Sequence, residues 1–163
     1  MKKIIILFSL LFFMGCGDER FHMTLNDENG FKTTFDGVKK ELKIVGWDKP
    51  FLLYYFSSDC GACAAQVPIL NEIINEYGDK IKVIGILGDT KGFDKDMEIL
   101  KDKKIKFAVV SNKKSVHFLA NAVGGIMGTP VTVIFDKNGK IAKSLLGLYP
   151  KTAFDNELKL LMD

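Results

Sequence analysis

The chain has 163 residues, of which 47% are hydrophobic and 26% are charged. This balance is typical of one globular domain with a sizeable core and excludes overall disorder. The 23 lysines and arginines against 20 aspartates and glutamates leave a net charge of +3, and Arg20 is the only arginine. Because nucleic-acid-binding domains carry a clustered basic surface, this composition excludes nucleic acid as a partner.

The first segment of the chain has the pattern of a secretory signal. Lys2 and Lys3 precede an apolar run over residues 4–14, which is too short to span a bilayer comfortably. The run ends at Gly15-Cys16, which resembles a bacterial lipobox, in which the cysteine becomes the lipid-modified first residue of the mature protein. The alternative is a plain N-terminal membrane helix in which Cys16 has no role. Both interpretations place the domain on the far side of the membrane.

The sequence therefore divides into three parts. These are a signal peptide over residues 1–15, a lipidated cysteine with a short tether over 16–20, and one domain over 21–163. The anchor predicts an extracytoplasmic location, in the periplasm or on the outer face of the cytoplasmic membrane. Disulfides form and persist in such compartments, so the two cysteines that remain, Cys60 and Cys63, are free to pair.

Within the domain, apolar residues recur with the periods of strands and helices. Residues 21–35 alternate around the turn-forming stretch 26–30, which predicts an N-terminal β-hairpin. The run 51–56 is apolar throughout, as expected of a central strand buried on both faces. A helix is expected to begin at the cysteine pair and to end at Gly78. Further strands are expected at residues 42–45, 81–87, 107–110, 131–135 and 141–146, and further helices at 93–103, 115–123 and 152–162. This alternation of strands and helices indicates the α/β class.

The most reactive feature of the sequence is Cys-Gly-Ala-Cys over residues 60–63, at the start of that helix. Two cysteines at this spacing can close a disulfide, and the N–H groups at a helix N-terminus stabilise a thiolate on Cys60. The thiolate is the nucleophile of disulfide exchange, and Cys63 can then resolve the mixed disulfide. A static structural disulfide is the alternative, although so small a loop adds little stability. Zinc is disfavoured because no second cysteine pair exists and the only histidines are His22 and His117.

The second feature is Gly-Thr-Pro over residues 128–130, directly before the strand 131–135. The order of strand, Cys-x-x-Cys helix, strand, and later Thr-Pro before a hairpin and a final helix resembles the thioredoxin superfamily over nearly the whole domain. The resemblance implies a thioredoxin fold, a central mixed sheet flanked by helices, here with an extra N-terminal β-hairpin. It also implies that Pro130 is cis beside the cysteine pair and that Thr129 offers backbone hydrogen bonds to substrate. The alternative is an ordinary trans proline at a strand entry.

Within this superfamily, three stretches are similar to the membrane-anchored, extracytoplasmic branch typified by TlpA and ResA. They are residues 48–56 before the cysteine pair, 66–68 after it, and 133–140 near the end. Pro68 matches the branch's proline in the first helix, where it should kink the helix. The resemblance implies reduction of particular protein disulfides, as in cytochrome c maturation, with a membrane electron donor that restores the dithiol.

The sequence departs from this pattern at its acidic residues. Asp59 stands before the first cysteine where the family usually has Trp, and an adjacent carboxylate opposes thiolate formation. Tyr54 occupies the position of thioredoxin's buried acid, and Gln66 the position of the Glu that many TlpA-like reductases carry. Asp59 is therefore either a substitute proton acceptor for Cys63 or a solvated helix cap. The missing Glu weakens the link to cytochrome c maturation.

These observations lead to a thiol–disulfide oxidoreductase that reduces or exchanges disulfides in protein partners through Cys60 and Cys63. A disulfide isomerase or an oxidase is the alternative within the same chemistry. The dipeptide between the cysteines lacks the histidine of strong oxidants, which favours a reductase or an isomerase. Periplasmic isomerases add a dimerisation domain for which this chain has no room, so a monomer is expected.

Two alternatives belong to other classes. The binding-class alternative is a copper chaperone, because thiolates suit Cu(I), but such proteins space their cysteines one residue wider and add a distant histidine. His117 is not obviously placed for that role, and His22, near the tether, is expected to be solvated. We therefore expect no metal and no cofactor. The third option is a redox-inert interaction domain.

Overall fold

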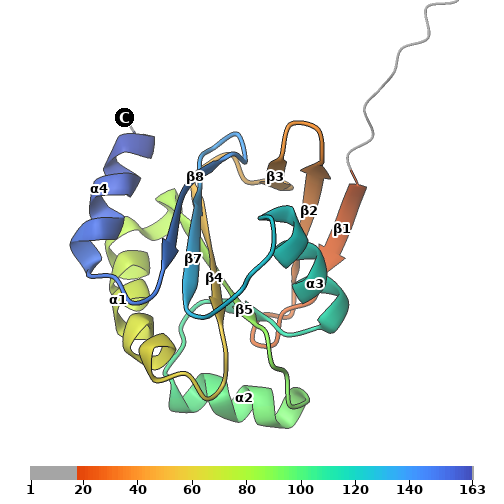
Figure 1. Ribbon diagram of the computed structural model, residues 1–163, viewed down its shortest axis with the longest axis vertical. Helices are drawn as coiled ribbons and strands as arrows, with labels where there is room; N and C mark the ends of the chain where they lie inside the picture. The colour runs from red at the N-terminus through yellow and green to blue at the C-terminus, as the bar shows by residue number, and fades with distance from the viewer. Residues whose placement is uncertain (1–17, 163) are drawn as a thin grey trace, which may run out of the picture.

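The computed structural model describes residues 18–162, which form two β-sheets and four α-helices (Figure 1). The predicted signal peptide over residues 1–15 and the lipid attachment residue Cys16 lie outside the described residues. Among residues 18–162, no helix has both the length and the apolar character needed to cross a bilayer.

The larger sheet has five strands in the order β6-β5-β4-β7-β8. Strands β5 and β6 run parallel to β4, whereas β7 is antiparallel to it and β8 is antiparallel to β7. The strands are β4 (Phe51–Phe56), β5 (Lys82–Leu87), β6 (Ala108–Val110), β7 (Val131–Phe135) and β8 (Ile141–Leu146). This is the mixed central sheet that the sequence predicts.

Helices cover this sheet on both faces (Figure 1). The helices are α1 (Gly61–Tyr77), α2 (Phe93–Asp102), α3 (Lys113–Ala122) and α4 (Lys151–Met162), and a 3-10 turn, η1 (Gly78–Lys80), follows α1. Because every residue of β4 is buried, alternate side chains of this strand serve two cores. Leu52 and Tyr54 pack with residues of α1 and α4, whereas Leu53 and Tyr55 pack on the other side with Leu119 of α3.

A smaller antiparallel sheet, β1 (Asp18–His22), β2 (Phe31–Asp36) and β3 (Glu41–Ile44), lies on the α3 side of the molecule (Figure 1). It confirms the N-terminal hairpin and the short strand that the sequence predicts. The position of the tether is corrected, because β1 already begins at Asp18. Asp18, Glu19 and Arg20 pair with β2 and are part of the domain rather than of a tether ending at residue 20.

The expectation that His22 is solvated is also wrong. Its side chain is only 1% exposed, and its Nε2 lies 2.8 Å from the hydroxyl oxygen of Thr33. The ring packs against Phe31 and Phe118, which come from β2 and α3. Local sequence could not reveal this burial, because the cover is supplied by a helix almost a hundred residues further along the chain.

The topology decides where the reactive residues meet. Since β4 and β5 are parallel, their carboxyl ends lie at the same edge of the sheet. The chain leaves β4 into Ser57 and the start of α1, and it leaves β5 into Gly88 and Asp89. Strand β7 is antiparallel to β4, so its first residue, Val131, enters at this same edge directly after Pro130.

Candidate redox site

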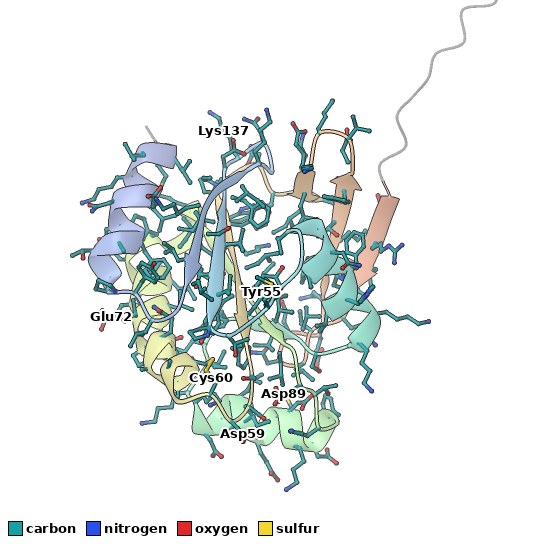
Figure 2. The ribbon with its side chains drawn as sticks, in the orientation of Figure 1. Tyr55, Asp59, Cys60, Glu72, Asp89 and Lys137 are labelled. Atoms are coloured by element: carbon teal, nitrogen blue, oxygen red, sulfur yellow. A yellow bond between two sulfur atoms is a disulfide. The ribbon has the colours of Figure 1, made fainter. Side chains whose placement is uncertain are left out.

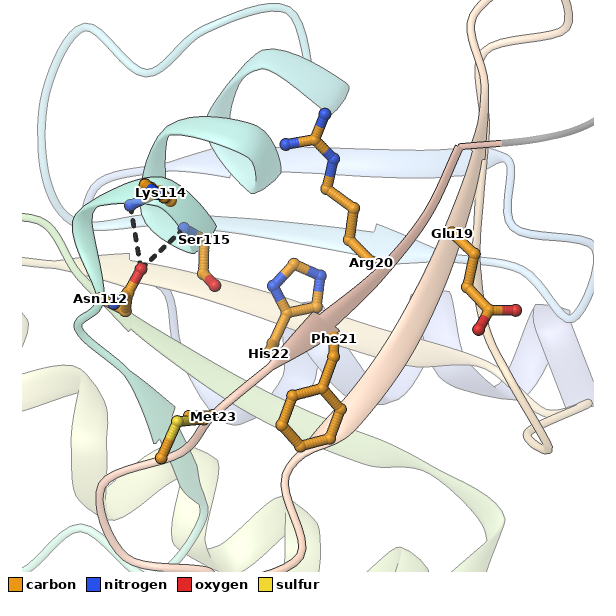
Figure 3. A pocket seen from close by; sticks show the side chains of 8 residues that line it. All are labelled: Glu19, Arg20, Phe21, His22, Met23, Asn112, Lys114 and Ser115. Carbon is orange, nitrogen blue, oxygen red and sulfur yellow. Dashed lines mark hydrogen bonds between the residues drawn. The ribbon is translucent and has the colours of Figure 1, made fainter.

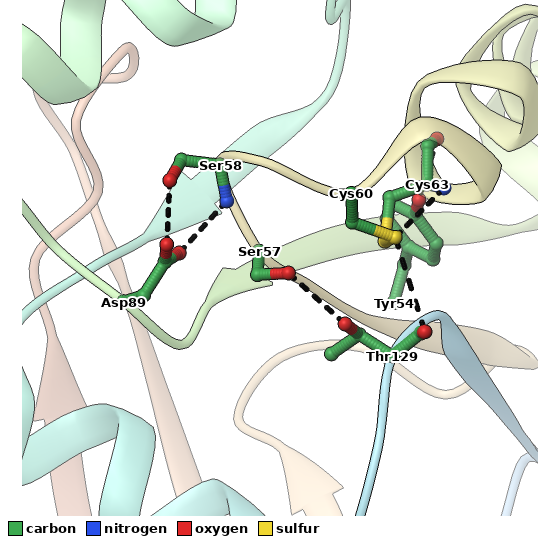
Figure 4. The surroundings of a disulfide bond; sticks show 7 residues. All are labelled: Tyr54, Ser57, Ser58, Cys60, Cys63, Asp89 and Thr129. Atoms are coloured by element: carbon green, nitrogen blue, oxygen red, sulfur yellow. Dashed lines mark hydrogen bonds between the residues drawn. A yellow bond between two sulfur atoms is a disulfide. The ribbon is translucent and has the colours of Figure 1, made fainter.

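Cys60 and Cys63 form a disulfide at the N-terminus of α1, with their Cα atoms 5.1 Å apart (Figure 4). Cys60 is the N-cap residue of the helix, and its Sγ accepts a hydrogen bond of 3.0 Å from the backbone N–H of Cys63. Cys63 is fully buried, whereas Cys60 is partly exposed. One sulfur therefore faces solvent, within reach of helix N–H groups that stabilise negative charge, and the second lies directly behind it.

The Thr129–Pro130 peptide bond is cis, as the family resemblance implies. The carbonyl oxygen of Thr129 lies 3.8 Å from Cys60 Sγ, and the hydroxyl oxygen of Thr129 lies 3.0 Å from that of Ser57, at the end of β4 (Figure 4). Thr129 is exposed and Pro130 is buried. The structure thus brings together Cys60, Cys63, Thr129 and Pro130, which the sequence singles out from segments about 70 residues apart.

Neither family position for a buried acid holds a group that can accept a proton here. Tyr54 is fully buried and donates a hydrogen bond of 2.8 Å to the carbonyl oxygen of Cys63, and burial raises the pKa of its hydroxyl. Gln66, also fully buried, donates from its amide to the carbonyl oxygen of Tyr149 at 3.2 Å and accepts from the Tyr149 N–H at 2.8 Å. Both side chains therefore have structural hydrogen bonds close to Cys63.

Asp59 is exposed and lies at the tip of the turn before α1 (Figure 2). Of the two alternatives for Asp59, the helix cap is excluded, because Cys60 itself is the N-cap. Its position next to Cys60 in the chain leaves the proton-handling role as a prediction.

Asp89 is a polar residue of this edge that the sequence analysis missed. Its carboxylate accepts hydrogen bonds from both the backbone N–H, at 2.8 Å, and the hydroxyl of Ser58, two residues before Cys60 (Figure 4). Partial burial raises the pKa of Asp89, but the two bonds from Ser58 and the charge of Lys91 outweigh it, and the pKa lies below its usual value. A carboxylate directly after a strand parallel to β4 is the signal that could have identified it.

A cavity of about 450 Å³ lies away from the sulfurs, between β1 and the start of α3 (Figure 3). Asn112 caps α3 there, accepting hydrogen bonds from the N–H groups of Lys114 and Ser115. Within residues 18–162, no three His, Cys, Asp or Glu side chains are grouped so that they could hold a metal ion. His117 is exposed on α3 beside Asn121.

Comparisons with known proteins agree with this geometry. The redoxin family model matches residues 31–158. The thiol-disulfide oxidoreductase ResA of Bacillus cereus is 24% identical over 147 residues, which cover 86% of this chain and 79% of ResA. Thioredoxin Y1 of Arabidopsis thaliana is 46% identical, but only over 55 residues, which cover 34% of this chain and 31% of that protein.

A solved structure shows the same fold over nearly the whole chain. The crystal structure of a thiol:disulfide interchange protein of the thioredoxin family from Chlorobium tepidum superimposes with a TM-score of 0.68 at 17% identity. The alignment covers 89% of this chain and 94% of the other. The fold is therefore the thioredoxin fold.

Proposed function

The chain belongs to the redoxin family and is a thiol–disulfide oxidoreductase, and we propose that it reduces or exchanges disulfides in partner proteins outside the cytoplasm. One observation carries the proposal: a partly exposed Cys60 Sγ lies 3.8 Å from the Thr129 carbonyl oxygen, with the buried Cys63 directly behind it. In this arrangement a substrate disulfide can approach Cys60 alone, while Cys63 is held ready for the second step.

In the reduced enzyme, the Cys60 thiolate attacks one sulfur of the substrate disulfide. A Cys60–substrate S–S bond forms as the substrate's own S–S bond breaks, and the leaving sulfur takes a proton. Cys63 then loses its proton and attacks Cys60 Sγ, which releases the second substrate sulfur as a thiol. The substrate gains two electrons, and the enzyme ends as the Cys60–Cys63 disulfide of this structure. A two-electron donor, which we place in the membrane, restores the dithiol.

The neighbours of the pair have supporting roles in this proposal. Thr129 pairs through its backbone with the extended substrate segment, and Pro130, which has no N–H, shapes the loop that presents Thr129. Asp59 accepts the proton of Cys63 or returns one to the leaving sulfur through water. The same carboxylate opposes the charge of a Cys60 thiolate. Because strong oxidants stabilise their reduced, thiolate form, Asp59 favours the reductase direction over the oxidase direction.

The location in this proposal rests on the N-terminal sequence. Cleavage before Cys16 and lipidation of that residue would hold a monomeric domain at the outer face of a membrane, where its substrates are folded extracytoplasmic proteins. The described chain begins at Asp18, two residues after the proposed attachment point.

The decisive experiment is a trapping reaction. In a Cys63→Ser variant the mixed disulfide cannot be resolved, so we expect substrates to remain linked to Cys60 and to be released by dithiothreitol on a non-reducing gel. The double variant Cys60→Ser/Cys63→Ser is the control and should trap nothing. If Cys63→Ser captures no protein and the reduced wild-type protein reduces no disulfide, the proposed function is wrong.

A further inference from the structure

An apolar groove of about 270 Å³ opens beside the redox site. Its floor is the face of β7 and β8 that carries Val131, Val133, Ser144 and Leu146, on which Leu146 pairs directly with Val131. Its wall is the connection between α3 and β7 (Figure 1), and none of the residues that line it is charged. A pocket for a whole small ligand usually measures about 300–1,000 Å³, so this groove has the size for side chains rather than for a cofactor.

The rim of the groove exposes large apolar side chains to solvent. Met127 is fully exposed, and Leu146 is 70% exposed. Ile126 adds a partly buried side chain beside them. Large apolar side chains gathered on a surface are typical of a site for a partner, because their exposure is unfavourable when nothing covers them.

The groove is continuous with the reactive residues. Met127 and Gly128 form its wall, and the next residue is Thr129, whose carbonyl oxygen lies 3.8 Å from Cys60 Sγ. On the other side of the groove, the N–H of Gly147, directly after Leu146, donates a hydrogen bond of 2.8 Å to the Pro130 carbonyl oxygen. The rim is therefore within reach of the residues that flank a substrate cysteine joined to Cys60.

From this continuity, and resting on the proposed function, we propose that the groove is a specificity subsite for an aliphatic side chain next to the reactive cysteine of the substrate. Leu, Ile or Met at that position would lose its contact with water against Val131, Leu146 and Met127. A charged side chain would lose hydration with no partner in the groove, so such substrates are disfavoured. The subsite selects protein disulfides by their flanking sequence, whereas Cys60 supplies the chemistry.

The test uses two disulfide-linked peptide dimers, one with Leu on both sides of its cysteine and one with Ser at both positions. We expect the reduced full-chain protein to reduce the Leu peptide about tenfold faster, as is typical of one apolar side chain in an apolar pocket. In the variant Met127→Ser/Leu146→Ser the ratio of the two rates should fall to about two or less. Because the readout is a ratio of two rates, a general change in the reactivity of Cys60 cancels. Met127 and Leu146 are both exposed, so their replacement does not disturb the core.

Val38→Ser is the matched control, because Val38 is 94% exposed in the turn between β2 and β3 of the smaller sheet, and its ratio should stay at the wild-type value. Equal rates for the two peptides with the wild-type protein, or an unchanged ratio in the double variant, would overturn the subsite. A concentration-dependent dimer that the double variant abolishes would also overturn it, since the groove would then bind a second copy.

Reduction of 5,5′-dithiobis(2-nitrobenzoate) by the wild-type protein separates failure of the subsite from failure of the proposed function. If it proceeds without peptide preference, only the subsite is wrong, and if it is absent, the proposed function fails as well.

Discussion

The Sγ atom of Cys60 caps helix α1 and is also the proposed nucleophile of disulfide exchange. It accepts the N–H of Cys63 as the cap of α1, and the same N–H favours a thiolate once the disulfide is reduced. The turn that presents this sulfur is held by Ser58, whose N–H and hydroxyl both bond to Asp89. A residue in the turn after β5 thus fixes the approach to the helix.

The buried His22 predicts that the stability of the protein depends on pH. Burial, and to a smaller extent the charge of Arg20, lower its pKa from 6.5 to about 4, and its Nδ1 has no hydrogen-bond partner in the described chain. As the pH falls below 6.5, His22 becomes protonated in the unfolded chain but stays neutral in the folded chain. The free energy of unfolding should therefore fall by up to about 3 kcal/mol between pH 6.5 and 4.

Urea denaturation at pH 7 and at pH 4.5 measures this effect. A His22→Gln variant, which keeps a neutral polar group at every pH, should lack this part of the pH dependence. His117→Gln replaces an exposed histidine and should retain it. Equal pH dependence in wild-type protein and His22→Gln would contradict the prediction.

At the scale of elements, Gln66 ties α1 to the segment that enters α4. Its amide uses one donor and one acceptor on the backbone of Tyr149, a residue 83 positions further along the chain. A glutamine can satisfy both groups at once, whereas an ionised glutamate cannot donate. The replacement of the family's usual acid therefore has a local structural explanation in this chain.

We predict that Gln66→Glu lowers the free energy of unfolding by about 2–3 kcal/mol at pH 7, because it buries a carboxylate that leaves the Tyr149 carbonyl without a donor. The loss should be smaller at pH 5, where the protonated acid can donate as the amide does. Denaturation curves at the two pH values measure it. Glu72→Gln, on the exposed face of the same helix, is the control and should change stability by less than about 0.5 kcal/mol. A loss that is equal at both pH values would show that the hydrogen bond is not its cause.

In the whole molecule, the reactive edge of the central sheet lies apart from the start of β1 (Figure 1). The Cys60 turn follows the carboxyl end of β4, whereas the turn between β7 and β8, which carries Lys137, lies at the opposite end (Figure 2). Strand β1 begins near that opposite end (Figure 1), so an anchor attached there leaves the redox site facing away from the attachment point.

The proposed lipid anchor at Cys16 predicts in which cell fraction the protein is found. A Cys16→Ser variant should move from the membrane fraction to the soluble extracytoplasmic fraction, because the residue that would carry the lipid is lost. Cell fractionation with an antibody against the domain measures this, with Cys63→Ser as a control that should remain in the membrane fraction. Retention of Cys16→Ser in the membrane would favour the plain N-terminal membrane helix.

The sequence by itself determined the elements and the reactive motif. The periodicity of apolar residues predicted the helices and strands to within a few residues, because the residues on a buried face recur at a regular spacing along the chain. The Cys60–Cys63 spacing likewise depends on neighbouring residues, and the structure confirms the helix start beside it. The cis bond before Pro130 is implied by the family resemblance rather than by local spacing, and the structure confirms it.

Only the tertiary structure decided which distant side chains meet. Three contacts join residues that no local pattern relates. Phe118 covers His22, Ser58 donates hydrogen bonds to Asp89, and Gln66 exchanges two hydrogen bonds with the backbone of Tyr149. The groove beside Thr129 likewise exists only because the end of β8 is brought next to the loop after α3. Such contacts depend on the order and direction of the strands, which set distances across the sheet independently of separation along the chain.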